Sequence, residues 1–374
     1  MKKRMAALAM AGCMAFSMIA CGQAGAEVTA QPQNEEAAAE EESVPAAEEL
    51  TAGESSEEQS AADQSNAGDE ETALSGKVTV YMPSPAGLAD KIAEAFTAKT
   101  GVEVEQFQGT TGEILARLEA EASNPVADVV ILASWSDGLS MKETGQLMSY
   151  APAEADNIVD GWIDEDSMLF GYSASAVGVI YNTAIYPEVS ADWEELADSR
   201  YKDDIAIPDG EKSGSCKDFL AGFVTGVENG QDILRSWADN GLTVPGANSA
   251  ALEAVTTGEK GILIAGVDYN AYSSIDKGEP IAMYYPATGT VVNPRPAMIM
   301  NTSPNVENAK AFVDFLFSDE AQALVVDAYL LPGRSDIKSD KRPNLEEIPQ
   351  IPTDWNLMLN EAMDTAAELN KLCQ

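Results

Sequence analysis

The sequence contains no histidine, and basic residues are scarce, with 22 Lys and Arg against 62 Asp and Glu and a formal net charge of −40. Without histidine, Ser-His and Cys-His catalysis are excluded, and any metal site would have to use carboxylates, phenolates or thiolates. The acidic balance argues against nucleic acid or an anionic membrane surface as the main partner, because both require a basic face. We expect no cofactor and no resident metal.

Cysteine is also rare, and two of the four cysteines, Cys216 and Cys373, lie outside the N-terminal region. Two cysteines carry no recognisable disulfide framework, so whether they pair stays open. Cys216 is expected in the first turn of a helix beside Lys217, and both features lower the pKa of a thiol. A cysteine nucleophile also needs a base, and the usual histidine is missing, so we consider a cysteine enzyme unfavoured.

The N-terminus has the pattern of an export signal. A basic start, KKR, precedes sixteen uncharged residues that end at Ala20. This run is short for a membrane-spanning helix, which needs about twenty apolar residues. The segment MIACG resembles the lipobox of bacterial lipoproteins, with Met18 in the place of the usual leucine. The resemblance implies a signal peptide over residues 1–20, lipidation of Cys21, and a mature protein anchored outside the cytoplasm.

Residues 21–75 have a different composition, rich in Ala, Glu, Ser and Gln, with no Lys, Arg or aromatic residue. Such a segment buries too little apolar surface to offset the entropy of ordering it. We predict a disordered acidic tether.

From Gly76 onward, strand and helix patterns alternate. KVTVYM, VEVEQF and DVVILA read as strands, separated by two amphipathic helical runs, and a second α/β round begins at SAVGVIYN. This alternation predicts an α/β fold with parallel sheets covered by helices. We predict two lobes joined by two crossings: residues 76–174 and 290–374 form the first lobe, and residues 175–289 form the second.

Small polar residues follow nearly every predicted strand. In open parallel sheets ligands bind beyond the carboxyl ends of the strands, so these residues are predicted to line a binding cleft. The candidate ligand-binding residues are Ser84, Gly109, Thr110, Thr111, Gly112, Ser134, Trp135, Ser213, Gly214, Ser215, Asp268 and Tyr269.

Two of these stretches stand before predicted helices, and each has two interpretations. Thr110 stands three residues before Glu113, as in a capping box, and Ser215 three before Asp218, as an N-cap. The same stretches can hold an anion, because a helix N-terminus offers free N–H groups and a partial positive charge. Trp135 is expected to be partly exposed.

The order of several motifs resembles a known family. VTVYMPSP, FQGTTGEILARLEAEASNPVADVVILAS, IAIPDGEKSGS, GILIAGVDY and ENAKAFVDFLFSDEAQ are similar to segments of the extracellular solute-binding proteins of ABC importers, in the group of ferric-iron, thiamine, phosphonate and sugar-phosphate binders. The resemblance implies two hinged lobes that close over one ligand and then dock on a membrane permease. A monomer is expected.

The motifs also bear on which ligand of this group the chain binds. Ferric-iron binders of this group carry an adjacent tyrosine pair where this chain has Tyr269 and Asn270, whereas Tyr284 and Tyr285 are expected in the hinge or core. We therefore expect an anion with a phosphoryl or phosphonyl group, held near Thr110 and Ser213, with Asp268 and Tyr269 at its other end. The alternatives are ferric iron, and, from other classes, a secreted enzyme or a surface adhesin.

Overall fold

The computed structural model describes residues 74–85 and 87–373. The predicted signal peptide, the lipidation site at Cys21 and nearly all of the predicted tether lie outside these residues. In the described part of the chain, ten strands form one mixed sheet, in the order β2-β1-β3-β9-β5-β7-β6. Beside this path, β4, β8 and β10 (Leu331–Pro332) pair with its strands. No helix among the described residues is long and apolar enough to cross a membrane.

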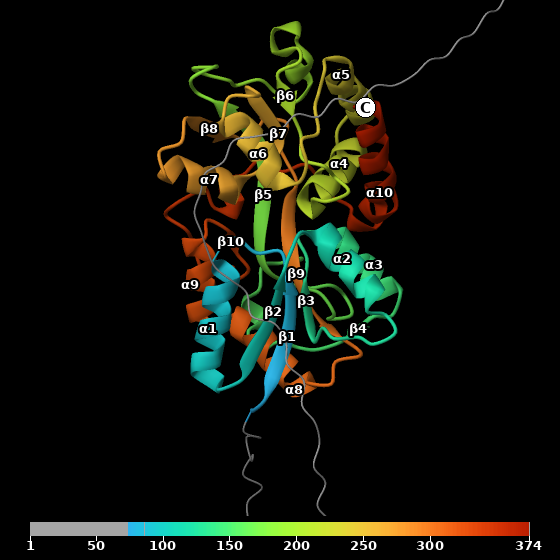
Figure 1. Cartoon of the computed structure of the whole chain (residues 1–374), viewed down its shortest axis with the longest axis vertical. Coiled ribbons are helices and arrows are strands. Elements are labelled where there is room, and N and C mark those ends of the chain that lie inside the picture. The colour runs from blue at the N-terminus through green and yellow to red at the C-terminus, as the bar shows by residue number, and fades with distance from the viewer. Residues whose placement is uncertain (1–73, 86, 374) are drawn as a thin grey trace, which may run out of the picture. The chain divides into compact units, whose positions relative to one another are not determined.

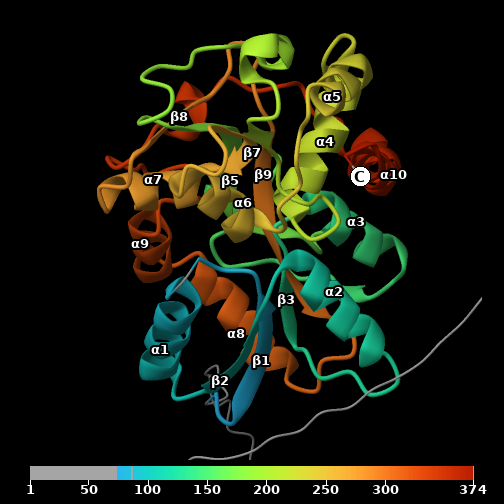
Figure 2. The ribbon, with the colours of Figure 1, turned by 45° about the horizontal axis from the view of Figure 1, so that its top comes forward.

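The first lobe is built on a parallel sheet. β1 (Lys77–Met82) pairs with β2 (Glu103–Gln108) and with β3 (Val129–Ile131), and the connections between them are α1 (Leu88–Thr100) and α2 (Thr111–Ala120). The sequence pattern places Leu88, Ile92, Ala95 and Phe96 on one face of α1; Leu88, Ile92 and Phe96 are buried, and Ala95 is half-buried. Figures 1 and 2 show α1 beside α8 (Val306–Leu316) and α9 (Asp319–Asp327) at the lower left. α3 (Trp135–Glu143) and β4 (Leu147–Met148) complete this lobe.

The second lobe is smaller in its sheet and richer in helices. Its parallel strands are β6 (Ile205–Ala206) and β7 (Ile262–Val267), and β8 (Ile281–Tyr284) pairs antiparallel with β5. The helices are α4 (Gly214–Gly226), α5 (Gly230–Asp239), α6 (Asn248–Thr256) and α7 (Asp268–Asp276). An aromatic cluster of Trp193, Trp237, Phe219 and Phe223 fills the core under α4 and α5.

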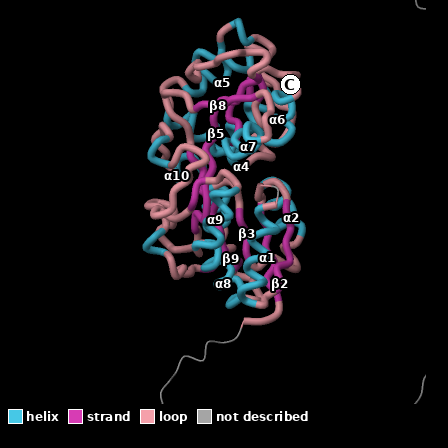
Figure 3. Tube along the Cα trace, turned by 90° about the vertical axis from the view of Figure 1, so that its left-hand side faces the viewer, coloured by secondary structure: helices cyan, strands magenta, loops and turns pink. Residues whose placement is uncertain are grey.

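Two long central strands, β5 (Phe170–Asn182) and β9 (Val292–Met300), join the lobes, as Figure 3 shows from the side. The first half of β5 pairs with β9, from Phe170 to Ala176, and its second half pairs with β7 from Val177 onward. β9 in turn pairs with β3 of the first lobe. The two predicted crossings are therefore these two strands, and they form the floor between the lobes.

The C-terminal helix α10 (Trp355–Leu372) differs from the predicted division of the chain. That division placed all of residues 290–374 in the first lobe, but α10 packs along α4 and α5 of the second lobe and also touches α3 (Figure 1). Its fixing contacts include Glu368 with Gln231 and Arg235. The apolar stripe of a helix does not identify the surface that it covers, so the sequence pattern left this placement open.

Candidate functional site

A pocket of about 470 Å³ opens between the two lobes. It is lined by loops after the first-lobe strands, by the starts of second-lobe helices, and by one residue of the central strand β9. The lining residues are Pro83, Ser84, Pro85, Gln108, Gly109, Thr110, Thr111, Glu113, Ala133, Lys212, Ser213, Gly214, Ala247, Asn248, Ser249, Tyr269, Asn270 and Arg295.

The start of α2 carries the predicted capping box. The Thr110 hydroxyl accepts the N–H of Glu113 at 3.2 Å, and the Glu113 carboxylate accepts the N–H of Thr110 at 2.7 Å. The N–H groups of Thr111 and Gly112 have no acceptor within the helix, because they belong to its first turn. At this edge of the pocket the helix start is therefore capped by side chains and still has free N–H groups.

The start of α4 lies directly opposite. Its N-cap is Ser213, which accepts the N–H of Cys216 at 3.2 Å, and not Ser215 as predicted. Ser215 is fully buried and its hydroxyl lies 3.2 Å from that of Ser213. α4 begins two residues earlier than the sequence pattern indicated, so Ser215 lies in its first turn and is not the N-cap.

The two helix starts touch across the lobes. A Cβ atom on Gly214 would lie 2.9 Å from the Thr111 hydroxyl and 2.8 Å from the carbonyl oxygen of Ala133. A Cβ atom on Gly112 would lie 3.0 Å from the backbone of Glu211. Glycine is therefore required at position 214 for this close approach of backbone to backbone.

Two further helix starts reach the pocket. α6 begins at Asn248 without a side-chain cap, and Asn248 and Ser249 line the pocket. α7 begins at Asp268, and its next two residues, Tyr269 and Asn270, also line the pocket. The sequence pattern identified Tyr269 as a candidate, but it predicted neither α7 nor a place for Asn248 at the pocket.

Arg295 forms the charged floor of the pocket and was missed by the sequence reading. It is 1% exposed, donates to the carbonyl of Pro83 at 2.6 Å, and its guanidinium lies 5.1 Å from the centre of the Tyr269 ring. Among the described residues no carboxylate lies within ion-pair distance of it, and its Nε has no hydrogen-bond partner. A single basic residue inside the apolar strand VNPRPAMIM was the available signal.

The other charged groups that line the pocket are engaged. Lys212 pairs with Asp209 at 2.9 Å, and Glu113 is held in the capping box. The hydroxyl of Ser84 is buried and, within the described part of the chain, has no partner. Arg295 and Ser84 are therefore unused hydrogen-bond donors on the floor of the pocket. A buried donor without a partner is costly, so a ligand that accepts from them would be favoured.

Asp268, a predicted ligand-binding residue, does not line this pocket. It is fully buried, and its carboxylate accepts from Arg342, from the hydroxyl of Tyr285 at 3.1 Å and from the N–H groups of Ala176 and Tyr269. The partner that a carboxylate at the end of an apolar strand requires comes from the protein itself.

Ser134 and Trp135 are also turned away from the pocket. The hydroxyl of Ser134, the N–H of Trp135 and the hydroxyl of Ser136 all donate to Asp218 of α4, the first two at 3.0 Å and 2.8 Å. Trp135 is 3% exposed and packs near Trp355 of α10, whereas partial exposure was expected. A second-lobe carboxylate thus occupies the start of α3 where a ligand was predicted.

The predicted site is therefore partly assembled. The pocket brings together Ser84, Gly109, Thr110, Thr111, Ser213, Gly214 and Tyr269; its lining does not include Gly112, Ser134, Trp135, Ser215 and Asp268.

The Cys216 thiol is buried and hydrogen-bonded within the protein. Burial raises the pKa of the Cys216 thiol far above its usual value, and the thiol donates to the carbonyl of Pro208. This is opposite to the lowering expected from its place in the first turn of a helix. Cys216 and Cys373 are both free and do not form a disulfide with each other.

A metal ion has few ligands among the described residues, where no group of three or more His, Cys, Asp or Glu side chains could hold one. Tyr284 donates its hydroxyl to the carbonyl of Ala191, and Tyr285 donates to Asp268. Both are internal hydrogen bonds, and Tyr269 is the tyrosine that faces the pocket.

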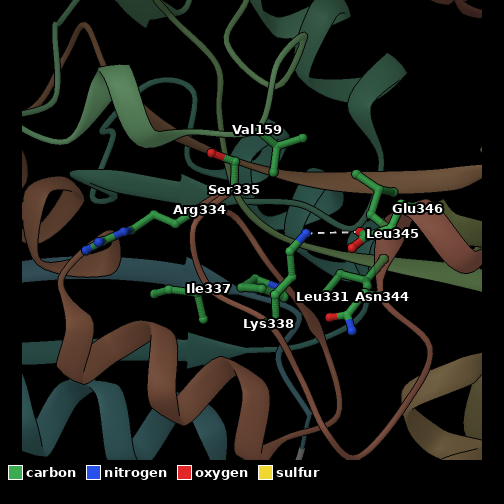
Figure 4. Close-up of a pocket in the computed structure, with 10 residues that line it drawn as sticks. Val159, Leu331, Arg334, Ser335, Ile337, Lys338, Asn344, Leu345 and Glu346 are labelled. Atoms are coloured by element: carbon green, nitrogen blue, oxygen red, sulfur yellow. Dashed lines mark hydrogen bonds and ion pairs between the residues drawn. The ribbon is translucent and has the colours of Figure 1, made fainter.

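A second cavity, of about 280 Å³, lies beside the 331–346 segment (Figure 4). Its lining is largely apolar, and its charged side chains are paired: Lys338 with Glu346 at 3.0 Å, and Arg334 with Asp336 at 2.7 Å. With its charges already neutralised, this cavity lacks the unused donors of the pocket between the lobes.

The sequence matches a family model. Residues 124–361 match the model described as bacterial extracellular solute-binding protein. Iron uptake protein A1 of Synechocystis sp. is 27% identical over 269 residues, covering 67% of this chain and 73% of that protein. A Salmonella typhi periplasmic protein named for 2-aminoethylphosphonate binding is 23% identical over 254 residues, covering 65% of this chain and 73% of its own length.

Solved structures share the fold. Iron-bound HitA from Pseudomonas aeruginosa superposes with a TM-score of 0.70 at 20% identity, covering 78% of this chain and 99% of that chain. AfuA from Actinobacillus pleuropneumoniae, with fructose-6-phosphate bound, gives a TM-score of 0.70 at 22% identity, covering 79% and 97%. These similarities establish the two-lobed periplasmic binding protein fold, and neither ligand transfers to this chain at such identities.

Proposed function

The chain belongs to the family of bacterial extracellular solute-binding proteins, and we propose that it is the substrate-binding lipoprotein of an ABC importer. In this proposal it captures a small anionic solute, a phosphorylated sugar or a phosphonate, between its lobes. It then delivers the solute to a membrane permease, while the lipid on Cys21 keeps it outside the cytoplasm at the membrane.

The proposal of an anionic ligand rests on Arg295. A guanidinium that is 1% exposed and has no carboxylate partner among the described residues needs a compensating negative charge. Its place on the pocket floor, against Tyr269, means that a ligand can supply that charge. A planar guanidinium suits phosphoryl oxygens, because it donates two parallel hydrogen bonds.

Helix starts supply the remaining attraction. α2, α4 and α6 all begin at the pocket, and each presents N–H groups without acceptors in its own helix. Such helix ends bind phosphate and carboxylate through both the N–H groups and the dipole. They act locally in a chain whose net charge of −40 repels anions at a distance.

The neutral end of the ligand would meet a different set of groups. Gln108, Asn248, Ser249 and Asn270 line the same pocket and can exchange hydrogen bonds with hydroxyl groups. Glu113 is the carboxylate that reaches the lining, and it already accepts the N–H of Thr110. This donor-rich arrangement supports a hydroxylated phosphate over a ligand that carries an ammonium group.

Ferric iron is the competing ligand, since relatives of this chain are named for iron uptake. A hard trivalent cation prefers several anionic oxygen ligands, such as phenolates and carboxylates. Tyr269 is followed here by Asn270, and Asp268 is consumed by Arg342, so the pocket offers one phenol and a guanidinium. These residues favour an anion.

Calorimetry tests the proposal directly. Hexose phosphates, aminoalkylphosphonates, inorganic phosphate and ferric citrate are titrated into the protein, and any bound ligand is checked for turnover. We expect binding of organophosphorus compounds without turnover. Tight ferric binding that is lost in Tyr269→Phe, with no organophosphorus binding, would overturn the proposal, and turnover would indicate an enzyme.

Salt offers a second test. Added salt screens the acidic surface, so it should raise the association rate of an anionic ligand and lower that of a cationic one. Stopped-flow fluorescence of the protein's tryptophans against salt concentration measures this sign.

A further inference from the structure

A buried ion pair lies behind the pocket, formed by Asp268 and Arg342, both with side chains that are 0% exposed. The two residues are 74 positions apart in the sequence. Neither lines the pocket, and ligand binding as proposed does not use them. Burying two charges is costly, and a pair in such a place needs a reason beyond stability.

The pair holds segments from both lobes. Arg342 donates to the carbonyl of Tyr329, just after α9 of the first lobe, at 2.8 Å, and to the hydroxyl of Tyr285 at 3.1 Å. Asp268 is the first residue of α7 in the second lobe. The guanidinium also lies 5.3 Å from the centre of the Tyr272 ring in α7. Arg342 therefore ties the end of α9 to the start of α7.

The carboxylate of Asp268 also marks the point where β5 passes from one lobe to the other. It accepts the N–H of Ala176 at 2.9 Å. Ala176 is the last residue of β5 that pairs with β9, opposite Val292, and Val177 is the first that pairs with β7, opposite Val267. A hinge strand is thus held by a side chain at the residue where its partners change.

The same carboxylate orients a residue of the pocket. Its second oxygen accepts the N–H of Tyr269 at 2.7 Å, and the Tyr269 ring stacks on Arg295. A chain of contacts therefore runs from Arg342 through Asp268 and Tyr269 to Arg295, the residue proposed to bind the anion. Separating the pair would leave two buried charges without compensation, which opposes its opening.

We propose that the Asp268–Arg342 pair is the fixed point of lobe closure, with Arg342 a positioning residue that holds the hinge of β5 and the start of α7 as the lobes rotate. The inference rests on the proposed capture function only in requiring that the lobes move. Its test uses no ligand, so its failure and the failure of the ligand assignment are distinguishable.

The experiment compares Arg342→Met and the neutral double variant Asp268→Asn/Arg342→Met with the wild type, as ligand-free full-length protein. The double variant leaves no unpaired buried charge and is expected to fold. Lys341→Met is the matched control. Lys341 is the residue before Arg342, and its ion pair with Asp327, at 2.6 Å, stays within one lobe. Amide hydrogen exchange is followed at Ala176, Tyr269 and Trp135.

The amide of Trp135 separates hinge control from local packing. It donates across the lobes to Asp218 and touches neither Asp268 nor Arg342, so it reports lobe separation. We expect exchange at all three amides to accelerate at least tenfold in the double variant and to stay unchanged in Lys341→Met. Acceleration confined to Ala176 and Tyr269, or no acceleration at all, would overturn the proposal.

Discussion

Two fully buried aspartates, Asp268 and Asp218, bind elements of the opposite lobe in different ways. Asp268 is neutralised by the guanidinium of Arg342. Asp218 accepts from two hydroxyls and one N–H at the start of α3, while the neighbouring Lys217 pairs with Asp137 instead. One carboxylate is balanced by a full charge and the other by neutral donors, and their responses to mutation should differ accordingly.

The largest expected effect comes from removing the cation of the first pair. Arg342→Met leaves Asp268 charged and buried, so the free energy of unfolding should fall by about 3–5 kcal/mol. The double variant Asp268→Asn/Arg342→Met should recover most of this loss. Urea unfolding followed by tryptophan fluorescence measures both, and equal losses in the two variants would contradict the charge argument.

The stability contribution of Asp218 should depend on pH. Burial raises the pKa of its carboxyl to about 6, with a further contribution from Asp137. Between about pH 4 and pH 6 the folded protein then holds a proton that the unfolded chain has released, so this contribution to stability is lost as pH rises through 6. Other carboxyls, such as that of Asp164 with its lowered pKa, act in the opposite direction.

Asp218→Asn isolates this effect. Between pH 4.5 and pH 7.5, the change in unfolding free energy of the variant should differ from that of the wild type by about 2–3 kcal/mol. Parallel stability curves for the two proteins would show that Asp218 does not titrate in this range.

Arg295 sharpens the comparison, because among the described residues this buried charge has no oppositely charged partner and donates to one neutral carbonyl. Arg295→Met should change the unfolding free energy by less than about 1 kcal/mol, since one hydrogen bond to Pro83 is lost. Affinity for the phosphorylated ligand should fall at least about 30-fold, which corresponds to roughly 2 kcal/mol. Arg235→Met, at an exposed pair with Glu368, is the matched control, and an equal loss in both variants would remove Arg295 from the site.

The smallest effect is expected at Thr110, the N-cap of α2. Thr110→Ala removes the cap of α2 and should cost about 1 kcal/mol of stability. Thermal unfolding measures it. Thr110→Ser, which keeps the hydroxyl, should behave as the wild type, and a matching loss there would point to the methyl group instead.

Local signals explain what the sequence predicted well. The capping box of Thr110 and Glu113 lies within four residues, and the alternating strands of the first lobe carry their own pattern. The α/β class depends on such short-range rules. The start of α7 was missed because its N-cap, Val267, forms no cap hydrogen bond and continues the apolar run of β7.

Long-range pairings explain what was missed. Asp218 and Trp135 are 83 residues apart, and Asp268 and Arg342 are 74 apart, so no local pattern announces that these partners consume the predicted ligand groups. Arg295 and Pro83 are separated by 212 residues. Which polar residue meets a ligand and which meets the protein is decided only when distant segments pack together.

Gly214 lies where the two lobes approach each other closely at the pocket. Its bare Cα lets the backbone of one half rest against Ala133 and Thr111 of the other, with no room for a single methyl group. The closest approach at this point is therefore set by the carbonyl oxygen of Ala133 and by the small side chains of Ser134 and Thr111. A larger cargo has to be accommodated by changing side chains elsewhere around the gap, whereas any bulk at position 214 would act as a wedge.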